Sequence, residues 1–138
     1  MTAPNRSPRP LPSSTVQLSI IRLAMLSGVL MFGGVVWWLR RSGSATEVDA
    51  AAIANVRILA AAGLGVAVSG LVALYALTGR QADEARRRTF SIIAWAMGEG
   101  AALAGGVYYM FAGDPRWYLG GLFVLLVSFV LFPARRRD

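Results

Sequence analysis

The 138-residue chain contains no cysteine and no histidine. The absence of cysteine excludes disulfides, thiolate metal ligands and cysteine nucleophiles. The absence of histidine removes the usual axial ligand of haem, the commonest zinc ligand and the commonest general base. Because no nucleophile–base pair and no metal shell can then be assigned, we expect a protein that is not an enzyme, with no catalytic residue, no metal and no cofactor.

Acidic side chains are also scarce, with 7 Asp and Glu against 14 basic residues, all of them arginine. The resulting net charge of +7 raises the question of nucleic-acid binding. These arginines flank apolar segments, however, where membrane topology and anionic lipid headgroups account for them. We therefore expect membrane lipid as a partner, and we expect neither nucleic acid nor a soluble substrate.

Hydrophobic residues make up 56% of the chain, which is too many for an ordinary soluble domain. They concentrate in four long runs, at residues 18–39, 58–77, 90–111 and 117–132. At about 1.5 Å per helical residue, each run approaches the roughly 30 Å thickness of the hydrocarbon layer. The pattern predicts an all-α integral membrane four-helix bundle, with one four-span transmembrane domain at residues 18–134.

The two ends of the chain are polar. Residues 1–17 combine several prolines with Ser, Thr and Arg and predict a disordered tail, and residues 135–138 form a short basic tail. A signal peptide is the alternative at the N-terminus, but the first apolar run is longer than a signal-peptide core and ends in two arginines. Before the second run, the capping-box pattern Ser44-Ala45-Thr46-Glu47 favours either an early helix start or a polar loop.

The distribution of arginine predicts the orientation in the membrane. Ten of the fourteen arginines lie on the side that both termini share. By the positive-inside rule, both termini are then cytoplasmic, in a multi-pass protein of a bacterial-type inner (plasma) membrane. Aromatic residues gather at the opposite, outer interface, where we expect them to act as anchors: Trp37, Trp38, Tyr108, Tyr109, Trp117 and Tyr118.

The first and third apolar runs share a sequence pattern. Ile20–Gly28 aligns with Ile92–Gly100, and the Gly-Gly-Val triplet that begins at Gly33 aligns with the one that begins at Gly105. Shared low-complexity composition is one explanation, because apolar segments draw on few residue types. The other is a parallel two-hairpin repeat with its axis along the membrane normal.

Glu99 is the only carboxylate inside an apolar run, and it lies about 13 Å from the start of that run at the helical rise. An ionisable group at this depth costs a few kcal/mol, so it is a functional candidate. Ser27 and Ser69 in neighbouring runs are the other candidates for an ion-binding site. The alternative is a neutral Glu99 that is hydrogen-bonded to Ser69, Ser27 or a backbone carbonyl, or is paired with Arg22.

Small residues at helical spacing predict where helices approach closely. The third run is rich in them, and so is the second, whereas the fourth is mostly Leu, Val and Phe. We therefore expect the second and third helices to pack together and the fourth to face lipid. The predicted packing positions are Gly98, Ala102, Gly106, Gly63 and Gly70.

Several of these segments carry a family resemblance. The stretch Gly63–Gly70, the loop Gly79–Glu84 and the segment Ala96–Ala101 followed by Gly105 resemble the hairpin of rotary ATPase rotor-ring proteolipid (c-type) subunits, over about residues 60–110. The resemblance implies that Glu99 is the ion-binding carboxylate and that Arg80-Gln81 is the loop motif. The chain departs from the family where Ala82 replaces a proline, where helices flank the hairpin on both sides, and in its termini, which four-helix members place outside.

The sequence therefore leads to two functional hypotheses. The first is a structural or accessory subunit that packs, with itself or with other membrane subunits, into a homo-oligomer or a larger membrane complex. The alternative is a proton- or sodium-carrying subunit that uses Glu99.

Overall fold

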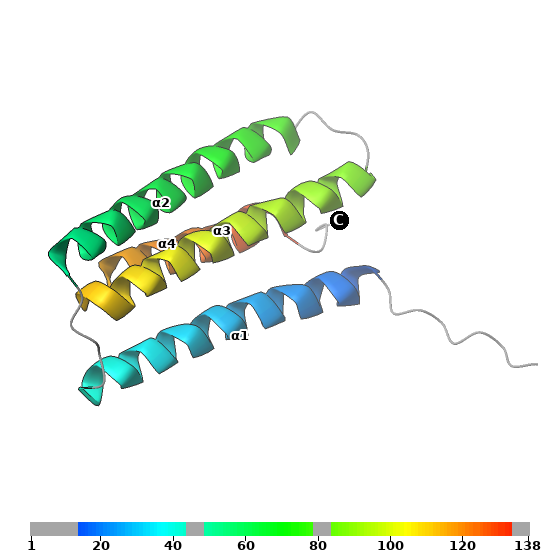
Figure 1. Cartoon of the computed structure of the whole chain (residues 1–138). Helices are drawn as coiled ribbons and strands as arrows, with labels where there is room; N and C mark the ends of the chain where they lie inside the picture. The colour runs from blue at the N-terminus through cyan, green and yellow to red at the C-terminus, as the bar shows by residue number, and fades with distance from the viewer. Residues whose placement is uncertain (1–13, 44–48, 79–83, 134–138) are drawn as a thin grey trace, which may run out of the picture.

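A computed structural model describes residues 14–43, 49–78 and 84–133. These residues form four α-helices and no strand: α1 Ser14–Arg41, α2 Ala50–Thr78, α3 Glu84–Ala112 and α4 Arg116–Leu131. The all-α expectation is confirmed for this part of the chain. Successive helices run in opposite directions, so the start of α1 and the end of α4 lie at the same end of the bundle (Figure 1).

Three of the helices are long and apolar enough to cross a membrane, over Val16–Arg41, Ala50–Thr78 and Ala85–Ala112. This is compatible with an integral membrane protein. The fourth helix is equally apolar but has 16 residues, or about 24 Å at the helical rise, against roughly 30 Å of hydrocarbon.

Three helices begin four or more residues before the apolar runs that predict them. α1 begins at Ser14, so residues 14–17, which were expected in the disordered tail, are helical. α2 and α3 begin at Ala50 and Glu84, among polar or small residues. Hydropathy marks where side chains become apolar, whereas backbone hydrogen bonding continues through polar flanks. The remainder of the N-terminal tail, the capping box, the Arg80-Gln81 motif and the basic C-terminal tail lie outside the described residues.

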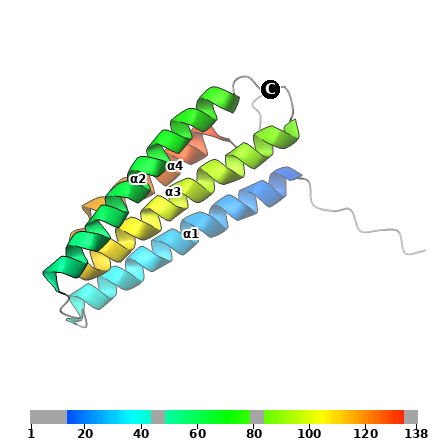
Figure 2. The same ribbon diagram turned by 45° about the horizontal axis from the view of Figure 1, so that its top comes forward.

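α3 is the central helix of the bundle and contacts each of the other three. α4 packs along one side of it, and α1 and α2 flank it in both ribbon views (Figures 1 and 2). Among the described helices, α1 and α2 are the one pair that do not approach each other. The two halves of the chain thus pack differently, since α3 and α4 form a close hairpin and α1 and α2 do not. The parallel repeat stays a prediction.

The most extensive helix contact is between α3 and α4. A Cβ atom added to Gly98 would lie 2.7 Å from the Cα atom of Leu125, and Gly121 lies directly against the backbone of Ala102. Glycines on both helices therefore allow backbone-to-backbone contact. The expectation that the fourth helix faces lipid is wrong for one of its sides, because Leu125 is fully buried, and it holds only for the other, where Phe123 is 66% exposed.

Candidate functional site around Glu99

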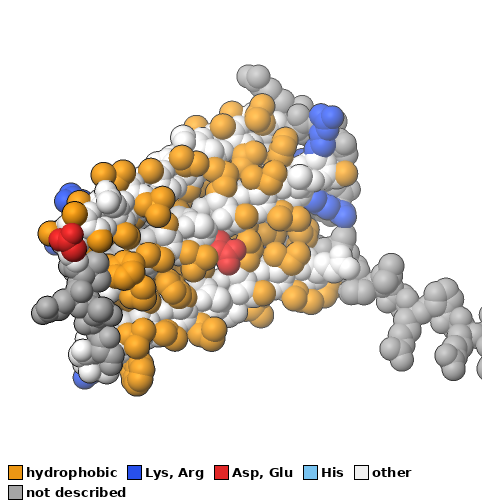
Figure 3. Space-filling model, viewed as in Figure 1, with side chains coloured by type: hydrophobic (Ala, Val, Ile, Leu, Met, Phe, Trp, Pro, Cys, Tyr) orange, Lys and Arg blue, Asp and Glu red, His pale blue; other side chains and the backbone are white. Residues whose placement is uncertain are grey.

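Glu99 lies halfway along α3 and is half-buried. Its carboxylate has no hydrogen bond and no ion pair with any residue that the structure describes. Figure 3 shows an isolated acidic surface halfway along the face that α2, α3 and α1 form, amid apolar and small side chains. Among the acidic residues whose side chains the structure describes, Asp49 and Asp114 lie just outside helix ends, and Glu99 lies within a helix.

The two serines proposed as co-ligands of Glu99 bond within their own helices. Ser27 Oγ donates to the carbonyl of Ala24 at 3.0 Å, and Ser69 Oγ donates to the carbonyl of Gly65 at 2.8 Å. Neither hydroxyl contacts Glu99. The described residues contain no cluster of three His, Cys, Asp or Glu side chains that could hold a metal ion. The structure therefore does not bring the predicted ion-site residues together.

Arg22, the other predicted partner of Glu99, points to a different helix. Its Nη2 donates to the carbonyl of Phe129 at 2.8 Å, and its guanidinium lies over the rings of Phe129 and Trp95, at 4.7 and 5.3 Å from their centroids. The indole nitrogen of the buried Trp95 donates to the carbonyl of Phe132 at 3.1 Å. Both donors thus satisfy carbonyls at the C-terminal end of α4, where a helix has unpaired acceptors and a partial negative charge.

Open space surrounds Gly100, which follows Glu99 on α3, and Gly28 on α1. A Cβ atom added to Gly28 on α1, or to Gly100 on α3, would have no atom within 4 Å. Exposed small or apolar residues lie about one turn away on the same helices: Ala24 before Gly28, and Ala96 and Leu103 before and after Glu99. We call this surface the Glu99 face and define it by six residues: Ala24, Gly28, Ala96, Glu99, Gly100 and Leu103.

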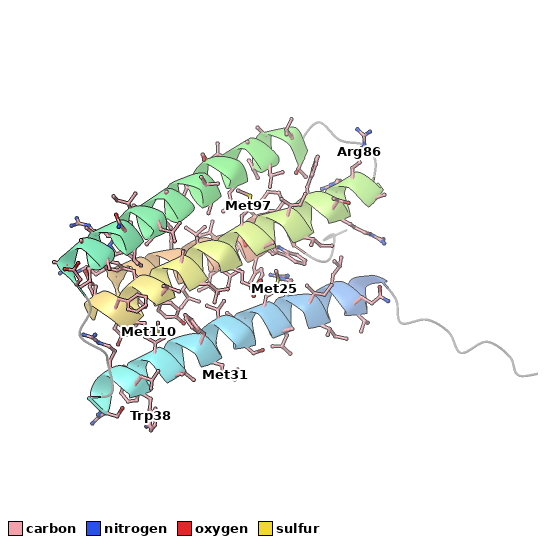
Figure 4. All side chains as sticks on the ribbon, in the orientation of Figure 1. Met25, Met31, Trp38, Arg86, Met97 and Met110 are labelled. Carbon is pink, nitrogen blue, oxygen red and sulfur yellow. The ribbon has the colours of Figure 1, made fainter. Side chains whose placement is uncertain are left out.

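The predicted packing residues lie elsewhere, inside the bundle. On α2, Gly63 faces Ala104 and Gly70 lies under the side chain of Met97, which Figure 4 labels between the two helices. On α3, Gly98 and Ala102 meet α4, and Gly106 meets Phe32 of α1 and Tyr118 of α4. None of these positions belongs to the Glu99 face. Sequence reasoning missed Gly28 as a site residue, although its alignment with Gly100 was the available signal.

The predicted aromatic anchors occupy the end of the bundle opposite Arg86, the end at which Figure 4 labels Trp38 and Met110. Trp37 and Trp38 are exposed there, as an interfacial role requires. Tyr118 is buried instead, and its hydroxyl donates to the carbonyl of Val29 at 2.9 Å. Its ring fits against Gly33, where a Cβ atom would collide with the phenol. Tyr118 therefore joins α4 to α1.

Comparison with known proteins identifies no relative of this chain. The chain matches no protein-family model. No curated protein and no solved structure matches it either.

Proposed function

We propose that this chain is an integral membrane subunit that assembles, with itself or with other membrane subunits, through the Glu99 face. The observation that carries the proposal is the Glu99 carboxylate, which lies at the middle of an apolar helix without a polar partner among the described residues. A polar group left unpaired in hydrocarbon costs several kcal/mol. A partner helix that offers a hydrogen bond at that depth removes this cost.

The proposal includes four membrane crossings with both termini in the cytoplasm of a bacterial-type cell. The short α4 is compatible with this arrangement because its C-terminal carbonyls accept hydrogen bonds from Arg22 and Trp95. A helix that ends below the membrane surface must satisfy these acceptors internally. The arginine and aromatic distributions support the orientation.

The test is native mass spectrometry of the protein extracted gently from its own membrane. We expect a complex of defined mass that contains more than one chain. Glu99→Leu should release the monomer, whereas Glu99→Gln, which keeps hydrogen-bonding capacity, should retain the complex. Ser69→Ala is the matched control, since the Ser69 hydroxyl bonds within α2. A wild-type protein that is monomeric in native membrane extracts would overturn the proposal.

A proton-carrying subunit is the second candidate function. The partial exposure of Glu99, together with the resemblance to rotor-ring proteolipids, supports it, because a carrier carboxylate must be reachable from outside its own helix bundle. Proton carriage needs no shell of ligands, whereas a bound cation needs about six oxygen ligands, and Ser27 and Ser69 are engaged elsewhere. Proton flux into liposomes that is lost in Glu99→Gln would favour this candidate over a purely structural role.

A further inference from the structure

We infer that the occupant of the Glu99 face is a second copy of this chain, related to the first by a two-fold axis along the membrane normal. This inference rests on the proposed function and names the partner in the assembly. It follows from three properties of the face: the register of its two helices, its empty glycine positions and the self-complementary chemistry of its carboxyl group.

The register comes from contacts between α1 and α3, which run in the same direction (Figure 1). The Arg22 guanidinium lies over the Trp95 ring, and Phe32 packs on Gly106. Gly28 therefore lies within about two residues of the level of Gly100, or about 3 Å at the helical rise. A two-fold axis along the membrane normal preserves depth. Such an axis near the α1–α3 seam brings α1 of one copy against α3 of the other at matching levels.

The two glycines of the face have no packing partner inside the monomer. Gly98 and Gly106 are needed because a Cβ atom there would collide with Leu125 or Phe32, whereas Gly28 and Gly100 have empty space around them, as Gly34 and Gly65 do outside the face. Glycine destabilises a helix interior relative to alanine, so glycines without a packing partner need another explanation. In membranes, glycines on a helix surface allow a second helix to approach closely. Two copies that place Gly28 against Gly100 would use both positions.

The carboxyl group supplies the polar complement. A protonated carboxylic acid has one O–H donor and free acceptor positions, so two such groups can bond to each other. Arg22, the arginine whose level is nearest, is hydrogen-bonded to the Phe129 carbonyl of α4. The two-fold axis brings Glu99 of one copy to the depth of Glu99 in the other. An interface of this kind is isologous, since the same patch serves both partners.

Cysteine cross-linking tests this arrangement cleanly because the natural chain has no cysteine. Ala24 and Ala96 each lie one helical turn before a glycine of the face, Gly28 and Gly100, and both alanines are exposed. Ala24→Cys and Ala96→Cys therefore leave the two glycines unchanged. Copies with different tags, one with each substitution, are co-expressed, and isolated membranes are then treated with an oxidant. The matched control is Ala76→Cys, which is exposed on α2 and outside the Glu99 face. We expect a cross-linked dimer for the Ala24→Cys and Ala96→Cys pair and none for the control.

Substitution of Glu99 in the same membranes tests the carboxyl pair. Glu99→Leu should lower the dimer association constant about tenfold or more, because each interhelical hydrogen bond in a membrane is worth roughly threefold to tenfold. Glu99→Gln should preserve the dimer. Equal cross-linking in wild type and Glu99→Leu would overturn the carboxyl pairing.

Native mass spectrometry of the same extracts separates the two proposals. A complex that contains a different chain and only one copy of this one, without Ala24–Ala96 cross-links, would overturn the second-copy inference and leave the proposed function standing. A protein that is monomeric by both methods would overturn both.

Discussion

The Arg22 guanidinium on α1 donates a hydrogen bond to the backbone carbonyl of Phe129 on α4 at 2.8 Å. Between these residues the chain passes through two other helices, so the contact joins the first helix to the end of the last. The guanidinium also stacks over the Phe129 and Trp95 rings. Arg22 therefore acts as a cap for a helix that is shorter than its neighbours, at the end where a cation is favoured.

Arg22→Met is expected to destabilise the bundle by about 1.5–3 kcal/mol, the usual contribution of a hydrogen bond to a charged group. Arg22→Lys should recover part of this loss, because lysine keeps the charge but not the planar stacking. Thermal unfolding in mild detergent, followed by tryptophan fluorescence, measures the effect. The control is Arg57→Met, since Arg57 is exposed on α2. Similar losses for Arg22→Met and Arg57→Met would contradict the capping role.

Tyr118→Phe removes the hydroxyl that bonds to the Val29 carbonyl at 2.9 Å while keeping the ring against Gly33. A loss of about 0.5–1.5 kcal/mol is expected, as for a single buried hydrogen bond. Tyr75→Phe is the matched control, because Tyr75 is 59% exposed on α2. The measurement is the unfolding free energy of each variant in detergent. Equal losses of unfolding free energy in Tyr118→Phe and Tyr75→Phe would show that the Tyr118 hydroxyl contributes nothing to stability.

The helical composition of the described chain could be predicted because long apolar runs are strong one-dimensional signals. Contacts between helices depend in addition on which side of each helix a residue occupies. Arg22 and Glu99 lie at similar depth, so depth alone suggested a pair. The Arg22 guanidinium instead donates to the Phe129 carbonyl of α4, and Glu99 has no ion pair among the described residues. Hydropathy indicates how deep a residue lies in the membrane, but not the direction in which its side chain points around the helix axis.

The position of α4 was mispredicted for a related reason. Its Leu, Val and Phe residues are equally suited to lipid and to a protein interior, because both surroundings are apolar. The decisive feature is the match of Gly121 on α4 with the backbone of Ala102, and of Gly98 on α3 with Leu125. This match becomes visible only when the register between the helices is known.

Glu99→Leu is expected to leave the stability of the isolated monomer unchanged within about 0.5 kcal/mol, or to increase it, since surface substitutions without lost contacts have small effects. The reason is that Glu99 has no hydrogen bond or ion pair within the described chain. The measurement is unfolding in a detergent that dissociates oligomers. A loss comparable to that of Arg22→Met would show that Glu99 has an intrachain partner and would remove the basis for an intermolecular one.

Alanine at Gly98 and at Gly100 should have opposite effects on the monomer, although the two residues are one position apart in sequence. At Gly98 the added Cβ would lie 2.7 Å from the Leu125 Cα atom, so α3 and α4 must separate, at a cost of about 1–3 kcal/mol. At Gly100 nothing lies within 4 Å, so Gly100→Ala should stabilise the helix by about 0.5–1 kcal/mol. Unfolding of both variants as detergent monomers measures these changes.

The same pair of variants separates packing within the chain from assembly between chains. In membranes, Gly98→Ala should lower the amount of folded protein. Gly100→Ala should leave that amount unchanged and yet reduce the Ala24–Ala96 cross-link, because an added methyl group holds the second copy away. A Gly100→Ala variant that is destabilised as a monomer would mean that this position is packed inside the bundle. Such a result would make close approach by another chain at Gly100 untenable.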